Sequence, residues 1–525
     1  MYGVDSYQEP FWAKSGNFVR GRDPLGIQNS SIATYATLLP GMTNLTLRLR
    51  YYGLYLWLLN EYHKLPENHN LKQSVTGQYT FVRRAELIVA FLMENNHPLE
   101  LAVIGSTYAR EHKEEVTEKG YYDIAKGADK LKESIKGSLY WDYTSGALGQ
   151  YYLGSLINLN LVTVKEGYFE RTETNGVDLA EAYDASLSND TKRVLLERII
   201  EGKLYTTDLE MIDAIALNKT LKGTVEGDFY KNLLVQADSI HAQASFQRKE
   251  SLQLFLSLLQ QEDQDWQTMP LICYNNCKSI ALENVTEAEI GWYFYQVNEI
   301  VHYGLETIFW ALLNTMDGNS FSYNNFIKHV TQLVYSEVKN QFEFNAKDSI
   351  VVADSVLFDN GIDTEFLIGK INEVVKTGDS KEGLLYGMLL LISAFNENQH
   401  QLEVLKNYAA NHQLNTKHGN IVEVTRQYGL DNKAWSFEVF VKKTMQRLLN
   451  EHTSVAYAKM GQGEKNLLKF IVEDNFLIHI ETMQPNFTNP RLKTLYNFTK
   501  DLSFIDNDGK LTMEGRDMLH QITAA

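Results

Sequence analysis

Apolar residues recur at helical spacing along most of the chain. Between residues 45 and 62, Leu47, Tyr51, Leu54, Tyr55 and Leu58 fall on one face of a predicted helix. Other large apolar residues surround this face, so we expect the helix to be buried on several sides. The same spacing predicts further helices at about 81–95, 98–112, 121–137, 229–241, 246–260, 286–314, 320–340, 381–411 and 434–450.

One stretch in the first third breaks this helical pattern. A helix over Leu148–Leu159 precedes a short strand over Leu161–Val164 and a second strand over Tyr168–Thr172. The turn Lys165-Glu166-Gly167 joins the strands, and another helix begins near Val177. Helix, hairpin and helix in this order are typical of a winged helix.

The C-terminus shows a similar order of elements. The pattern predicts helices and a hairpin over Lys465–Asp474, Arg491–Asp501, Leu502–Ile505, Lys510–Thr512 and Glu514–Ile522. Asp508-Gly509 lies between the two predicted strands and favours a tight turn. The prediction is therefore a mainly α, multi-domain helical protein with two winged-helix-like units.

These patterns divide the chain into four consecutive segments. Residues 1–95 form a loop-rich N-terminal segment with a buried aromatic helix, and residues 96–188 form the first winged-helix-like unit. Residues 189–454 form a helical domain, and residues 455–525 form the C-terminal winged-helix-like domain.

Composition supports a helical protein of a reducing compartment. Only 8 of the 525 residues are proline, which breaks helix interiors. Two cysteines, Cys273 and Cys277, cannot build a disulfide framework in a chain this long. The start shows no signal peptide, and the longest apolar run, Leu384–Phe395, is too short to span a bilayer. We therefore expect a cytoplasmic protein with no membrane contact.

The charge balance restricts contact with nucleic acid. The formal net charge is −17, which argues against a protein that coats nucleic acid, because such binding neutralises phosphates. The first predicted recognition helix, 147–160, carries no charged side chain, so it is expected to pack against protein. The second is better equipped for double-stranded DNA, and its candidate contacts are Arg491, Lys493, Lys500 and Lys510.

Four arginines near the N-terminus form a candidate anion site. Arg20, Arg22, Arg48 and Arg50 lie close to glycines and to the start of the buried helix. The alternative is structural: Arg48 and Arg50 would pair with acids of neighbouring helices.

A Glu-x-x-His spacing, which places both side chains on one helix face, occurs three times. The pair Glu299/His302, with Glu306 one turn further on, is the candidate for metal chemistry. Ordinary thiols are expected at Cys273 and Cys277, which lack a second pair to complete a zinc site. The chain has no G-x-x-x-x-G-K-[ST] loop, G-x-S-x-G elbow or H-E-x-x-H helix. We therefore predict no catalytic residue, no metal ligand set and no cofactor.

Three N-terminal motifs carry a resemblance to a known group of proteins. The motifs are R-D-P-L-G (Arg22–Gly26), P-G-M-T-N (Pro40–Asn44) and R-L-R-Y-Y (Arg48–Tyr52). They resemble the opening of uncharacterised bacterial protein families encoded in antiphage defence islands. The resemblance covers about the first 185 residues and implies a component of a multi-gene system, usually beside an ATPase or nuclease.

Three functional hypotheses follow. The first is a non-enzymatic adaptor or scaffold of an antiphage defence complex, whose winged-helix units dock a partner ATPase or nuclease encoded nearby. The second is a DNA-binding sensor or regulator that uses the C-terminal unit. The third is a metal-dependent enzyme at Glu299/His302.

Overall fold

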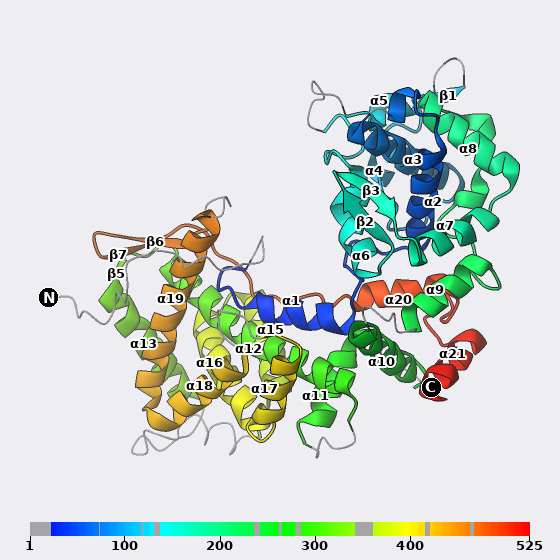
Figure 1. Cartoon of the computed structure of the whole chain (residues 1–525). Helices are drawn as coiled ribbons and strands as arrows, with labels where there is room; N and C mark the ends of the chain where they lie inside the picture. The colour runs from blue at the N-terminus through cyan, green and yellow to red at the C-terminus, as the bar shows by residue number, and fades with distance from the viewer. Residues whose placement is uncertain are drawn as a thin grey trace. The chain divides into compact units, whose positions relative to one another are not determined.

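The computed structural model describes residues 23–72, 74–116, 118, 120–130, 137–235, 242–261, 265–279, 285–341, 361–414, 421–461 and 467–524. The chain is mainly helical, with small antiparallel sheets (Figure 1). It forms two compact units, each assembled from separate stretches of sequence. Unit 1 contains residues 1–35 and 270–490, and unit 2 contains residues 36–269 and 491–525.

Unit 1 is built around one long buried helix. Its elements are the start of α1 (Gln28–Leu38), most of α11 (Met269–Cys277), α12 (Glu287–Met316), β5 (Phe321–Ser322), α13 (Tyr323–Gln341), α15 (Thr364–Thr377), α16 (Ser380–Asn398), α17 (Leu402–Asn411), α18 (Ile421–Ala434), α19 (Phe437–Gly461), β6 (Phe470–Glu473) and β7 (Phe476–His479).

The sequence explains both the start and the burial of α12. Thr286 and Glu289 form a capping box, in which each side chain accepts a hydrogen bond from the other residue's backbone N–H. The helix is apolar on nearly all sides, and α16, α17, α18 and α19 pack around it (Figure 1). This is the pattern expected for a helix in the centre of a core.

Unit 2 places its aromatic helix α2 in its core. Its elements are α2 (Arg50–Lys64), η2 (Asn70–Lys72), α3 (Val75–Asn96), α4 (Ser106–Glu111), β1 (Tyr121–Asp123), α5 (Ile124–Ala128), the π-helix η3 (Leu148–Tyr152), α6 (Leu153–Asn158), β2 (Val162–Lys165), β3 (Tyr168–Arg171), α7 (Asn175–Ala185), α8 (Asn189–Glu201), β4 (Lys203–Tyr205), η4 (Thr206–Asp208), η5 (Asp213–Ile215), α9 (Val225–Val235), α10 (Ala242–Leu259), η6 (Trp266–Thr268), α20 (Leu492–Asp501) and α21 (Met513–Ala524).

Buried polar groups organise the core of unit 2. The Glu86 carboxylate accepts hydrogen bonds from the hydroxyls of Tyr55 and Tyr140 and from the backbone N–H groups of Ala147 and Leu148. It therefore satisfies amides at the start of the π-helix that have no partner within the helix. Burial raises the pKa of Glu86, although these donors oppose the shift.

The first predicted hairpin is confirmed. Strands β2 and β3 pair antiparallel, with Val162 opposite Arg171 and Lys165 opposite Tyr168. The helix before it, 148–158, and the helix after it, α7, are also present. At the C-terminus the predicted hairpin is reduced to a single bridge between Ile505 and Leu511. The winged-helix assignment itself is not confirmed for either stretch.

The helix predicted over Lys465–Asp474 is wrong. Residues 470–473 form β6, which pairs with β7, and β7 also pairs with β5. Asp474 and Asn475 both have positive φ, as a two-residue type I′ hairpin turn requires. The run Phe470-Ile471-Val472 has high strand propensity, which the helical interpretation overlooked.

Three other predicted helices were too long. The prediction for 381–411 is divided at residues 399–401 into α16 and α17. The prediction for 98–112 is helical only over α4, and the prediction for 121–137 begins as strand β1 before the short α5. None of the described helices is long and apolar enough to cross a membrane.

The close approach of α12 and α16 gives a test of the core of unit 1. A methyl group at Gly387 would lie 2.7 Å from Ile308 Cγ1 and 3.1 Å from the Gly304 carbonyl oxygen. We expect Gly387→Ala to lower the free energy of unfolding by about 1–3 kcal/mol through overpacking. Gly369→Ala, at an exposed position of α15 with free space around it, should instead stabilise by roughly 0.5–1 kcal/mol. Urea denaturation of both variants checks this, and equal effects would contradict it.

Candidate functional site

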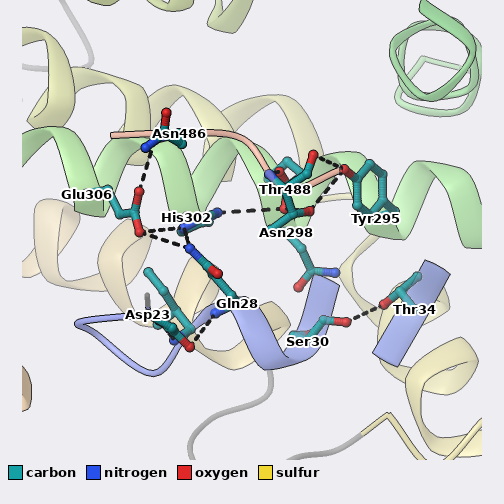
Figure 2. Close-up of polar contacts among 12 residues, drawn as sticks. Asp23, Gln28, Ser30, Thr34, Tyr295, Asn298, His302, Glu306, Asn486 and Thr488 are labelled. Atoms are coloured by element: carbon teal, nitrogen blue, oxygen red, sulfur yellow. Dashed lines mark hydrogen bonds and ion pairs between the residues drawn. The ribbon is translucent and has the colours of Figure 1, made fainter. Parts of the chain in front are cut away.

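The predicted pair Glu299/His302 lies in a fully buried polar cluster of unit 1 (Figure 2). His302 Nε2 lies 2.9 Å from Glu306 Oε1, and His302 Nδ1 lies 3.7 Å from Glu299 Oε1. Burial opposes a charge on the ring, but the two carboxylates outweigh it and raise the pKa of His302 to about 10. The ring is therefore an imidazolium at neutral pH.

The two glutamates hold a neighbouring stretch of chain through hydrogen bonds. Glu299 accepts the backbone N–H of Thr488 at 2.6 Å and the Thr488 hydroxyl at 2.9 Å. Glu306 accepts the backbone N–H of Asn486 at 3.0 Å. Tyr295 donates its hydroxyl to the Thr488 carbonyl oxygen at 3.2 Å (Figure 2). We call residues 484–490 the strap, because this segment lies along α12 through these bonds.

The segment before α1 approaches the same cluster. Asp23 caps α1 by accepting the backbone N–H groups of Ile27 and Gln28. Gln28 then donates its side-chain amide to Glu306 Oε1 at 3.3 Å (Figure 2). Glu306 is thus shared by the imidazolium of His302, the start of α1 and the strap.

Helix α19 holds the other side of this N-terminal segment. The Lys459 ammonium donates to the Asp23 carbonyl oxygen at 2.8 Å, and His452 Nδ1 lies 3.0 Å from the Pro24 carbonyl oxygen. His452 Nε2 accepts the Lys469 backbone N–H at 2.9 Å, so the ring must be neutral with its proton on Nδ1. Burial lowers the pKa of His452 to about 4.

This geometry gives the cluster a structural role. The oxygens of Glu299 and Glu306 accept hydrogen bonds from Gln28, Asn486 and Thr488, and the same two carboxylates flank the His302 ring. Among the described residues, no group of three or more His, Cys, Asp or Glu side chains is arranged to hold a metal ion. Cys273 and Cys277 are both buried free thiols, and burial raises the pKa of each.

The predicted anion site is only partly described. Arg20 and Arg22 lie outside the described residues. Arg48 contacts Glu100 at 2.8 Å and Asp501 at 3.5 Å, and donates to the Leu217 carbonyl oxygen. Its charge is therefore met by acids of the same unit.

Arg50 has a similar environment. It lies 3.5 Å from Glu226 and donates to the carbonyl oxygens of Ala214 and Ala216. These contacts match the structural alternative for the two arginines. Asp501 also accepts the backbone N–H of Leu49 at the start of α2, and burial raises the pKa of Asp501 to about 6.

The predicted DNA contacts lie on and after α20 in unit 2. Lys493 and Lys500 are exposed and seven residues apart, which places them on one side of the helix two turns from each other. The Lys493 ammonium lies 5.4 Å from the ring centre of Tyr496 and 5.9 Å from that of Trp266. Lys510 is also exposed, whereas Arg491 is partly buried near the Leu39 carbonyl oxygen.

Five large apolar side chains of unit 2 that are exposed lie within three residues of an ion-paired Arg48, Glu100, Lys222 or Glu514, and we call this set the apolar rim: Leu45, Leu99, Leu101, Val225 and Met513. Leu99, Leu101 and Met513 are the most exposed, at 93%, 81% and 75%. Ion pairs link the loops that carry them, because Glu100 is bound by Arg48 and Glu514 is bound by Lys222. Arg48 also binds the Leu217 carbonyl oxygen, which connects the two pairs.

Sequence reasoning missed several members of these sites. Asp23 lies five residues before α1, away from the usual cap position, and Leu99 and Leu101 belong to a mostly apolar segment for which the spacing predicted a helix, so neither signal stands out. No local signal identifies His452, Lys459, Asn486 or Thr488, because their partners are distant in the sequence.

Comparison with known proteins yields no relative. No protein-family model matches the chain, and neither a curated protein nor a solved structure is significantly similar to it.

The buried His452 of unit 1 predicts that stability depends on pH. His452 is held neutral in the folded state, whereas the unfolded chain binds a proton with the ordinary pKa of 6.5. Its contribution to stability is therefore complete above pH 6.5 and is lost as the pH falls through about 4. One pKa unit corresponds to about 1.4 kcal/mol, so we expect up to about 3 kcal/mol from this residue.

The measurement is urea unfolding between pH 7 and pH 4 for the wild type and for His452→Gln. Carboxylates contribute equally to both curves, so the difference between them isolates the histidine. We expect a shallower decline for the variant, because glutamine does not titrate. Parallel curves would show that His452 is not held neutral.

Proposed function

We propose that this chain is a non-enzymatic adaptor subunit that docks a partner protein through the apolar rim of unit 2. The observation that supports it is the exposure of Leu99, Leu101 and Met513 on loops that ion pairs hold in place. Single exposed apolar residues are ordinary, but Leu99 and Leu101 expose two large apolar side chains in one short loop, which favours a protein interface there. Fixed loops lose little conformational freedom on binding, which favours affinity.

The rim draws on both stretches that the sequence predicts to be winged-helix-like. Leu99 and Leu101 belong to 96–188, and Met513 belongs to 455–525. The resemblance to antiphage defence-island families suggests the partner: an ATPase or nuclease encoded nearby. Charged side chains between the apolar ones, such as Glu100 and Lys222, would then form the polar part of the interface.

The test is co-migration with products of neighbouring genes in gel filtration. We expect the double variant Leu99→Ser/Leu101→Ser to weaken the complex by roughly 100-fold or more, because each buried leucine contributes about 1.5–3 kcal/mol. Leu430→Ser, which changes an exposed leucine of unit 1, is the matched control and should bind normally. Absence of any complex with the wild type, or full binding by the double variant, would refute the proposal.

A second function, contact with double-stranded DNA, is favoured by the two exposed lysines on one side of α20. Lys510 would add a third contact beyond the helix. The exposed acids Asp506 and Asp508 oppose phosphate binding there, so the contact would be local and weak.

For this second function we expect Lys493→Ala/Lys500→Ala to weaken duplex binding and to reduce the salt dependence by about two phosphate contacts. Lys442→Ala/Lys443→Ala removes two exposed lysines from α19 of unit 1 and is the control for charge alone. Fluorescence anisotropy at several salt concentrations provides the measurement. If the wild type does not bind, or binds independently of salt, this function is ruled out.

The metal-enzyme hypothesis gains no support from the geometry of Glu299 and His302. Glu306 pairs with His302, and the two carboxylates accept the backbone amides of Asn486 and Thr488, so the contacts of these residues are all made within the chain.

A further inference from the structure

Two of the places where the chain passes between the units lie next to the buried cluster in unit 1. The first follows Tyr35, within α1, and the second follows Pro490, at the end of the strap. The segments that lead to them start from Gln28 and from Asn486 to Thr488. Both starting points bind the cluster formed by Glu299, His302 and Glu306 (Figure 2).

The two segments share one carboxylate. Glu306 Oε1 accepts Gln28 Nε2 and faces His302 Nε2, while Glu306 Oε2 accepts the Asn486 amide. Both glutamates and the histidine are at most 1% exposed, so water cannot replace a lost partner without local opening. Loss of one segment leaves buried charge without its partners and weakens the hold on the other.

Each of the two segments also makes contacts besides those to Glu299, His302 and Glu306. The strap also contacts Tyr295, which itself interacts with Glu299, and a stacked pair of rings, Tyr303 and Phe487, lies outside the cluster with its centres 4.2 Å apart. The start of α1 is held independently by Lys459 and His452. Both segments therefore bind the cluster, and each has additional contacts, the strap to α12 and the start of α1 to α19.

We propose that Glu299, His302 and Glu306 form a latch that couples the two connecting segments, so that the strap and the start of α1 open together. This coupling goes beyond docking and does not require a partner. In sequence, the strap continues into α20, whose Asp501 lies 3.5 Å from Arg48, and α1 is followed by the loop that carries Leu45 of the rim. A coupled latch would thus act on the two segments that lead to the docking surface.

The experiment is hydrogen exchange of the full chain, resolved to single amides by fragmentation mass spectrometry. Gln28→Ala removes one donor from Glu306 but does not touch the strap. We expect it to accelerate exchange of the Asn486 amide by about fivefold to tenfold, in the range of ordinary coupling between sites. The reciprocal variant, Thr488→Val, removes a hydroxyl from Glu299 and should accelerate the amides of Ile27 and Gln28.

A matched control lies in the same unit. Glu397 accepts the Thr364 amide at 2.7 Å, together with Ser393, Tyr274 and Lys278. Glu397→Gln should accelerate Thr364 and leave Asn486 unchanged, and Gln28→Ala should leave Thr364 unchanged.

The experiment has three outcomes, of which one supports the latch and two overturn it. Faster exchange at the distant segment in both variants, with Thr364 unaffected, supports the latch. Exchange confined to the mutated segment overturns it, because the two segments would then open independently. Faster exchange at Thr364 as well would mean loosening of the whole unit and would also overturn it. Neither result bears on whether a partner binds the apolar rim.

Discussion

The requirement that buried charges be paired determines how unit 1 is assembled. Removing an ion from water costs several kcal/mol even after relaxation, so a buried imidazolium such as His302 persists only beside its carboxylates. Glu299 and Glu306 in turn need donors, and the chain supplies them from the strap and from Gln28. Segments almost 460 residues apart in sequence are thereby fixed to one helix.

The same requirement explains the N-terminal motif. Asp23-Pro24-Leu25-Gly26 does not present charge to solvent in unit 1. Leu25 is part of the core, the backbone carbonyls of Asp23 and Pro24 are bound by α19, and the Asp23 carboxylate caps α1. In unit 2, Arg48 and Arg50 are neutralised by Glu100, Asp501 and Glu226. Charged residues of a sequence motif can therefore serve to hold the fold together instead of binding a ligand.

The local sequence pattern correctly predicted those elements that interactions between neighbouring residues determine. The burial and boundaries of α12 follow from its apolar periodicity and its cap, and the β2–β3 hairpin follows from its turn. Pattern failed where a distant partner decides the outcome. Strand β6 exists because β7 pairs with it, and β7 also pairs with β5 about 155 residues earlier. Both units combine stretches that are distant in the sequence, which local pattern does not show.

The candidate site, too, was predicted only where neighbouring residues determine it. Glu299 and His302 were found because their i,i+3 spacing is visible in sequence, but their chemistry depends on Asn486, Thr488 and Gln28, which spacing cannot reveal. A Glu-x-x-His pair in which backbone amides reach the carboxylates is a structural ion pair, while one with free oxygens could bind metal. The groups that contact such a pair therefore decide its function.

The ion pairs of Arg48 and Arg50 inside unit 2 also mean that the two proposed surface functions depend differently on salt. Because Arg48 and Arg50 are buried beside carboxylates inside unit 2, they cannot add to a phosphate-binding surface, and any DNA contact rests on a few lysines against a net charge of −17. Such a contact weakens steeply with salt. Burial of Leu99, Leu101 and Met513 is not electrostatic and depends little on salt. A partner retained at high ionic strength would thus be held by the apolar rim, and one released by salt would be held by α20.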